Sequence, residues 1–287
     1  LGGNTTASEN TAVGMYSLLT NSTGTLNTGV GIGALQNSTT SDSNTAVGGY
    51  SLHTNTTGAS NTAIGVSSLR ANTSGASNTA LGFGALYTNT TGAQNTSVGL
   101  NAMCKNTEGA SNVGVGVLAL SCNTTADYNT AVGEKALWKN TTASSNTAVG
   151  YSALSANTTG SSNTAVGCGS GVAITTGVRN TAVGISTLLA VTTADDNTAI
   201  GRCALRKTTG SGNTATGKDA LICNTSGASN TSMGKYSLSA NTTGEGNIGI
   251  GNYGGEYNTT GSRNIFIGFA TTGSAVDLGC QIVLATA

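Results

Sequence analysis

An asparagine that opens a short motif returns at a nearly constant interval along this sequence. Sixteen such asparagines occur; fourteen of the fifteen intervals between them are 17 residues long, and the interval from Asn197 to Asn213 is 16. With this Asn as position 1, the consensus reads N-T-A-V-G-x-x-A-L-x-x-N-T-T-G-x-x. Such a period predicts that each repeat forms one coil of a solenoid, whose apolar residues are buried by stacking on the neighbouring coils.

The length and composition of the repeat favour β-structure. Helical repeats are longer and need more Leu, Glu and Lys, whereas 17 residues suit a coil of two short β-like segments and two turns. Coils of this kind stack at a strand spacing of ~4.8 Å. The predicted fold is therefore all-β, a parallel β-solenoid (β-roll) of about sixteen 17-residue coils. We assign residues 1–270 to the solenoid and 271–287 to a C-terminal cap or junction segment.

The composition sets the width of the core. Charged residues make up 8% of the chain, aromatic residues 4%, and proline is absent. Large apolar side chains are too few to fill a wide core, so the interior is expected to be one or two side chains across. Disorder, the alternative for a sequence rich in Gly, Ser, Thr and Asn, is disfavoured because the net charge is zero and the aliphatic residues are periodic.

Two positions of the repeat predict specific structural roles. Asn at position 1 is expected to form a ladder of amide hydrogen bonds between coils. Gly at position 5 occurs in all sixteen copies, which indicates a positive φ or a close backbone approach. The first six members of each set are Asn10, Asn27, Asn44, Asn61, Asn78 and Asn95, and Gly14, Gly31, Gly48, Gly65, Gly82 and Gly99.

Strand alternation places positions 2 and 4 on one face and positions 1, 3 and 5 on the other. Because position 2 is Thr, Val or Ile and position 4 is mostly aliphatic, we expect the face of positions 2 and 4 to be buried. The other face carries Asn, a residue that is Ala, Gly or Ser in fifteen of sixteen copies, and Gly, with Phe266 as the exception at position 3. A second copy of the chain is expected to pack there, which predicts a homotrimer.

The asparagines at position 12 mostly lie in N-x-S/T sequons within a predicted turn. In a secretory setting they are candidate N-glycosylation sites, although N-T-T-G as ordinary turn chemistry explains the same spacing. The candidates are Asn21, Asn55, Asn72, Asn89, Asn123, Asn140, Asn157, Asn224, Asn241 and Asn258.

Residues for catalysis or for cofactor and metal binding are scarce. His53 is the only histidine, Gly29–Gly33 falls on the glycines of the repeat, and Asp195-Asp196 lacks the recurring Asp of calcium-binding repeats. The six cysteines form no CxxC pair, so we expect small, tolerated residues rather than a disulfide framework. The sequence therefore predicts no enzyme, no cofactor and no metal site.

Charge and hydropathy narrow the choice of partners. Eleven acids and eleven bases are scattered along the chain, so no basic stripe is available for nucleic acid, and no run of eighteen apolar residues suits membrane insertion. Aromatic residues at positions 6 and 7, such as Tyr16, Tyr50 and Phe83, suit stacking on a cell-surface glycan or packing between chains.

The motif of Asn61–Gly75 and Asn146–Gly160 resembles repeats of phage tail-fibre-like proteins. It is also similar to a longer version of the head repeats of trimeric autotransporter adhesins, and the likeness extends from about Asn4 to Phe269. This resemblance implies a parallel β-roll, association of three chains, and a surface that serves attachment.

These observations predict a structural extracellular fibre or attachment protein at a cell or virion surface. Because the sequence begins in mid-coil at Leu1 and ends with the apolar stretch Gln281–Ala285, end-to-end filaments or a fragment of a longer chain are both expected alternatives. The competing hypothesis is a ligand-binding solenoid, an ice-binding or carbohydrate-binding module. Ice binding needs a flat outward array of Thr, and strand alternation places the Thr of position 2 with the residues expected to be buried.

Overall fold

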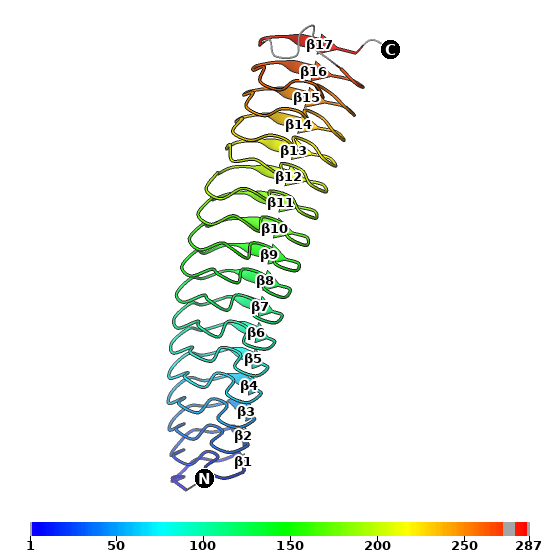
Figure 1. The fold of residues 1–287 in the computed structure, drawn as a ribbon. Helices are drawn as coiled ribbons and strands as arrows, with labels where there is room; N and C mark the ends of the chain where they lie inside the picture. Colours follow the sequence, from blue (N-terminus) through cyan, green and yellow to red (C-terminus); the bar gives the residue numbers. More distant parts are fainter. Residues whose placement is uncertain (1, 272–278, 286–287) are drawn as a thin grey trace. The chain divides into compact units, whose positions relative to one another are not determined.

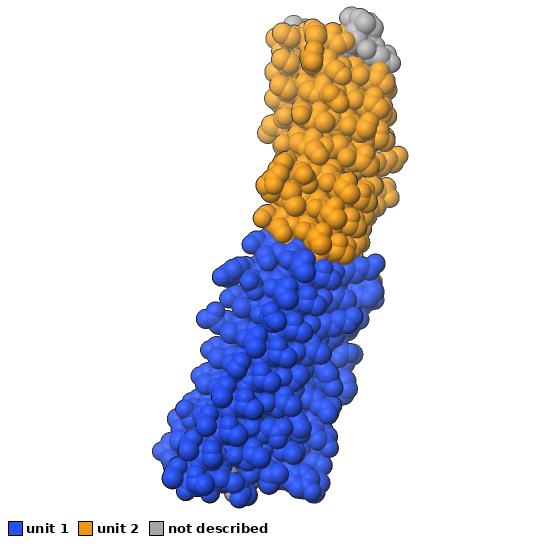
Figure 2. Space-filling model, turned by 90° about the vertical axis from the view of Figure 1, so that its left-hand side faces the viewer, with its two compact units in different colours: residues 1–145 blue, residues 146–287 orange. Residues whose placement is uncertain are grey.

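The computed structural model describes residues 2–271 and 279–285, which form an all-β parallel β-solenoid of about sixteen coils. Each coil contributes one three-residue strand, drawn as an arrow in Figure 1. The chain divides into two compact units, residues 1–145 and 146–287, which are coloured separately in Figure 2. The predicted all-β parallel β-solenoid of about sixteen coils is confirmed, and the homotrimer stays a prediction.

All strands occupy positions 2 to 4 of the repeat. In the first unit they are β1 (Thr11–Val13), β2 (Thr28–Val30), β3 (Thr45–Val47), β4 (Thr62–Ile64), β5 (Thr79–Leu81), β6 (Thr96–Val98), β7 (Val113–Val115) and β8 (Thr130–Val132). In the second unit they are β9 (Thr147–Val149), β10 (Thr164–Val166), β11 (Thr181–Val183), β12 (Thr198–Ile200), β13 (Thr214–Thr216), β14 (Thr231–Met233), β15 (Ile248–Ile250), β16 (Ile265–Ile267) and β17 (Ile282–Leu284).

Within each unit, successive strands pair in parallel and in register, so that equivalent positions lie side by side. For example, Thr62 pairs with Thr79 and Ile64 with Leu81. The 16-residue repeat keeps this register, because Thr198 still pairs with Thr214. The missing residue is therefore absorbed in the turns outside the strand.

The interior is narrow, as predicted, but the face of the strand expected to be buried is the outward one. Asn61 and Ala63, at positions 1 and 3, have no exposed surface, whereas Ile64 at position 4 is 39% exposed. Position 3 is small where the position 9 side chain is large, and the buried Phe266 at position 3 lies against Gly255 at position 9. A Cβ added to Gly114 at position 3 would lie 2.8 Å from Met103 Cγ at position 9. The aliphatic side chains of position 4 therefore point outwards. The face of positions 1, 3 and 5, where a second copy of the chain was expected to pack, lies inside the coil instead.

Position 9 supplies the large side chains of the core from an unusual backbone conformation. Leu52, Leu69 and Leu86 are fully buried at φ values of 48°, 47° and 51°. The left-handed region costs an L-residue about 1–2 kcal/mol, whereas burial of a Leu side chain contributes about 1.5–3 kcal/mol. Burial outweighs the strain, and Leu persists there.

The second β-like segment expected in each coil is replaced by turns in the described residues. The backbone has positive φ at position 7, as at Ser67 (58°), and again at position 9, as at Leu69 (47°). This alternation prevents an extended strand, and the segment instead stacks through backbone hydrogen bonds such as Leu69 N–H to Ala85 O, 2.9 Å.

Part of the predicted C-terminal segment continues the coils. β17 pairs in parallel with β16, and Gln281 takes position 1, where its backbone N–H donates to Asn264 Oδ1 at 2.9 Å. The remainder of that segment, residues 272–278 and 286–287, and the predicted mid-coil start at Leu1 lie outside the described residues.

Candidate functional site

The asparagines of position 1 form the predicted ladder inside the coils. Asn78 Oδ1 accepts a hydrogen bond from the backbone N–H of Asn95 at 3.0 Å and another from its side-chain amide at 3.2 Å. Asn78 Nδ2 also donates to the carbonyl of Gly92 at 2.8 Å. Each amide therefore closes its own coil and holds the next one, so these residues are structural.

The glycines of position 5 combine both features predicted for them. Gly82 has a φ of 134°, and a Cβ there would lie 2.6 Å from the carbonyl oxygen of Gly99 in the next coil. Gly65, with a φ of 132°, has the same relation to Gly82. A side chain at position 5 is excluded by the backbone of the following coil.

The candidate glycosylation sites are not surface residues, which corrects the expectation that position 12 lies on an exposed turn. Asn55, Asn72 and Asn89 are fully buried, and Nδ2 of each of the last two donates to the Oδ1 of the preceding Asn at 2.8 Å. A glycan on such an amide would have to occupy the core. The same burial holds for Asn21, Asn123, Asn140, Asn157, Asn224 and Asn241, and Asn258 is 5% exposed.

One signal in the sequence points to this second ladder. Where position 12 departs from Asn in the second unit, it becomes Ile174, Val191 or Thr208, and all three side chains are buried. Aliphatic substitutes in place of an amide are typical of an interior position rather than of a glycosylated turn.

The outward face of the strands carries Thr at position 2 and an aliphatic residue at position 4. Because pairing is in register, these side chains form parallel columns along each unit, such as Thr45, Thr62 and Thr79 beside Val47, Ile64 and Leu81. These residues are exposed or half-buried. The Thr array that ice binding would need therefore points outwards, contrary to the sequence-based expectation.

A third outward column, at position 6, lies next to the aliphatic one. In the first unit it is largely apolar and exposed, with Met15, Val66, Phe83 and Leu100 among its members. Exposed apolar surface that continues from coil to coil is typical of an interaction surface rather than of a free monomer.

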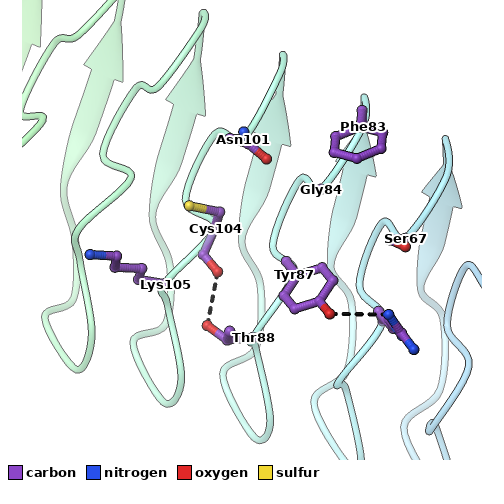
Figure 3. Close-up of a pocket in the computed structure, with 9 residues that line it drawn as sticks. Ser67, Phe83, Gly84, Tyr87, Thr88, Asn101, Cys104 and Lys105 are labelled. Carbon is purple, nitrogen blue, oxygen red and sulfur yellow. Dashed lines mark hydrogen bonds between the residues drawn. The ribbon is translucent and has the colours of Figure 1, made fainter.

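A pocket of about 490 Å³ lies beside these columns in the first unit (Figure 3). Its lining residues occupy positions 6, 7, 10 and 11 of three successive coils: Ser67, Arg70, Phe83, Gly84, Tyr87, Thr88, Asn101, Cys104 and Lys105. Figure 3 shows the rings of Phe83 and Tyr87 on the two sides of Gly84. A Cβ added at Gly84 would meet the side-chain amide oxygen of Asn101, another lining residue.

Aromatic rings hold the guanidinium of Arg70 at the pocket. Arg70 lies 5.3 Å from the centre of the Tyr50 ring and 5.8 Å from that of Tyr87, and its Nη1 donates to the Tyr87 hydroxyl at 3.1 Å. Partial burial, and secondarily the charge of Arg70, lower the pKa of the neighbouring His53. Burial raises the pKa of the Cys104 thiol, which disfavours a reactive thiolate.

The remaining residues singled out in the sequence have local partners. Asp196 forms two hydrogen bonds with Arg179, at 2.6 and 2.9 Å, which hold the pKa of its carboxyl below the usual value. Asp195 Oδ1 accepts from the backbone N–H of Val178 at 2.8 Å. The two carboxylates therefore bind neighbouring coils, and all six cysteines are free thiols.

Over residues 2–271 and 279–285, no three His, Cys, Asp or Glu side chains gather in a way that could hold a metal ion. The same residues contain no helix with the length and apolar character needed to cross a membrane. A comparison of the chain with protein-family models gave no match, and a comparison with curated protein sequences gave none either.

Proposed function

We propose that this protein is a structural or attachment fibre in which the columns of positions 2 and 4 join copies of the chain into a homotrimer. The observation that supports this proposal is the uniformity of an outward surface. Position 2 is Thr in thirteen of sixteen repeats and position 4 is Val, Ile or Leu in fourteen, whereas the outward positions 6, 7, 10 and 11 vary freely.

A surface repeated so regularly fits a partner that is itself periodic. Another copy of the chain has the same spacing between coils and would cover the exposed aliphatic column. The families that the repeat resembles associate as trimers, and three such faces can close around one axis. Attachment at a cell or virion surface, with no nucleic acid, cofactor or catalysis involved, completes the proposal. End-to-end assembly of such fibres into filaments stays a prediction.

The test is the native mass, measured by sedimentation or mass spectrometry. We expect three times the chain mass of 28.0 kDa. The paired substitutions Ile64→Lys and Leu81→Lys put charges on the outward column and should dissociate the trimer. A matched control, Ser60→Lys with Ser77→Lys, alters the exposed position 17, where Arg179 and Arg263 occur naturally. A parent protein of one chain mass contradicts the proposal.

Ice binding is the second candidate, because the Thr column is outward and in register after all. Ice is periodic too, and hydroxyl and methyl groups at strand spacing can order water along one face. The same preparation decides between the two functions. A monomer that slows ice growth supports ice binding, whereas a trimer without this effect supports the fibre.

A further inference from the structure

The pocket between Phe83 and Tyr87 differs from the repeating surface around it. The nine lining residues come from three coils. The middle coil has the aromatic residues Phe83 and Tyr87 at positions 6 and 10 and Gly84 at position 7, a combination that neither of the other two coils has. Phe83 is 57% exposed and Tyr87 36% exposed, so both rings present apolar faces to solvent. A volume of about 490 Å³ lies within the usual range for small-ligand sites.

The charges of the pocket restrict its ligand. Arg70 and Lys105 are cations, and no carboxylate is among the lining residues. Ser67, Thr88 and Asn101 add hydroxyl and amide groups (Figure 3). Two rings for stacking, two cations and several neutral polar groups match a sugar ring that carries a carboxylate.

We propose that this pocket binds an acidic saccharide, with a sugar ring stacked on Tyr87 and its carboxylate facing Arg70. The inference rests on the attachment role proposed above, since an attachment fibre needs a receptor site. It is tested separately from the oligomeric state, because Phe83 is the only lining residue in the position 6 column and the others lie at positions 7, 10 and 11.

The position of Arg70 supports this assignment. Its contacts with the Tyr50 and Tyr87 rings and with the Tyr87 hydroxyl restrain a long side chain before any ligand arrives. A guanidinium held in place loses less conformational entropy on binding a carboxylate. Arg70 is thus expected to select acidic over neutral sugars, whereas Tyr87 is expected to contribute affinity for both.

The experiment is titration calorimetry of the full chain with tetragalacturonate, and with neutral galactotetraose and AMP as comparison ligands. We expect tetragalacturonate to bind and galactotetraose to bind more weakly. AMP should bind no more tightly than tetragalacturonate. Tyr87→Ala should weaken binding about tenfold, and Arg70→Gln should remove most of the discrimination between acidic and neutral sugars.

Two further variants separate loss of the site from loss of the fold. Gly84→Ser places a side chain against the amide oxygen of Asn101 at the pocket and should weaken binding, while the backbone conformation is one that Ser67 adopts at the same position with a φ of 58°. Tyr128→Ala removes an exposed aromatic of the first unit outside the pocket and should bind like the parent. Melting temperatures of all variants, together with the native mass, are measured on the same samples.

Absence of tetragalacturonate binding, equal binding by Tyr87→Ala and the parent, or tighter binding of AMP each overturns the proposal. A trimer that binds no sugar contradicts the saccharide site alone. A monomer that binds acidic sugar through Tyr87 and Arg70 contradicts the trimeric fibre alone.

Discussion

The two units share the ladder of position 1 and differ in the ladder of position 12. In residues 1–145 the repeats starting at Asn10 have Asn at position 12 with a single exception, Ser38, whereas residues 146–287 have Ile174, Val191 and Thr208 in three successive repeats. Position 1 is Asn in all sixteen repeats of both units. One buried amide can therefore be replaced, and the other is always kept.

The hydrogen bonds explain this difference. The carbonyl of Gly92 at position 15 accepts from both Asn78 of position 1 and Asn89 of position 12, at 2.8 and 2.9 Å. Where position 12 is Ile174, the equivalent carbonyl of Gly177 still accepts from Asn163 at 2.8 Å. Only the position 1 side chain also satisfies a buried backbone N–H of the next coil. Loss of the position 12 amide leaves no backbone group without a partner.

The coil with Ser38 at position 12, the exception in the first unit, also keeps the hydrogen bond from the position 1 amide to the position 15 carbonyl. Ser38 and Ser41 take positions 12 and 15 together, with their hydroxyls 2.6 Å apart, and Asn55 Nδ2 donates to Ser41 Oγ at 3.1 Å. Asn27 at position 1 again reaches the position 15 carbonyl of its own coil, that of Ser41, at 2.7 Å.

The largest expected effect comes from position 5, which both units keep as Gly. Gly82→Val would place a side chain against the Gly99 carbonyl at a φ of 134° and should destabilise the fold by more than about 4 kcal/mol. Gly49→Val is the matched control, because position 6 carries Val66 in the next repeat and the only atom near the added Cβ is Ile32 Cγ2 at 3.4 Å. Thermal melting followed by circular dichroism measures both. Equal melting temperatures for Gly82→Val and the parent contradict the close-approach argument.

A smaller effect tests the two ladders against each other. Asn78→Val removes the acceptor of the buried Asn95 N–H and should cost about 3 kcal/mol. Asn89→Val takes the donor from the buried Asn72 Oδ1 but leaves the Gly92 carbonyl bonded to Asn78, and should cost about 2 kcal/mol. Denaturant unfolding of the two variants gives the difference. Equal losses of stability would contradict this explanation. They would mean that Ile174 and Val191 are tolerated because of the residues around them and not because of the hydrogen bonds of position 12.

Much of this architecture is contained in the period of the sequence. The spacing of Asn and Gly predicts the coil, the position 1 ladder and the close approach at position 5, because these depend on one residue meeting its own copy in the next coil. The direction of the strand faces cannot be obtained in this way. Alternation shows that positions 2 and 4 share a face, but it does not show which face is inside. That depends on Leu69, whose left-handed backbone directs its side chain into the interior, so that Ala63 is buried and Ile64 is exposed.

The pocket was beyond the reach of periodicity for a different reason. Arg70, Tyr87 and Lys105 lie at variable positions of three different repeats, so no consensus brings them together. The aromatic residues at outward positions suggest glycan stacking in general. Their meeting around Gly84 depends on the stacking order of particular coils.

The smallest expected effect is confined to the first unit, which contains the only histidine of the chain. Burial and the charge of Arg70 lower the pKa of His53, so the unfolded chain binds this proton more readily than the folded one. Above the ordinary pKa of about 6.5, His53 is neutral in both states and the linkage has no effect. As the pH falls through that value towards the lower pKa of the folded state, the folded form loses stability, and the loss levels off below it.

His53→Gln, which introduces the residue found at position 10 of the preceding repeat, should reduce the drop in melting temperature between about pH 7.5 and about pH 5. Hydrogen exchange should show the protection of amides in residues 146–287 unchanged by the substitution, and a variant that loses as much stability on acidification as the parent contradicts the prediction.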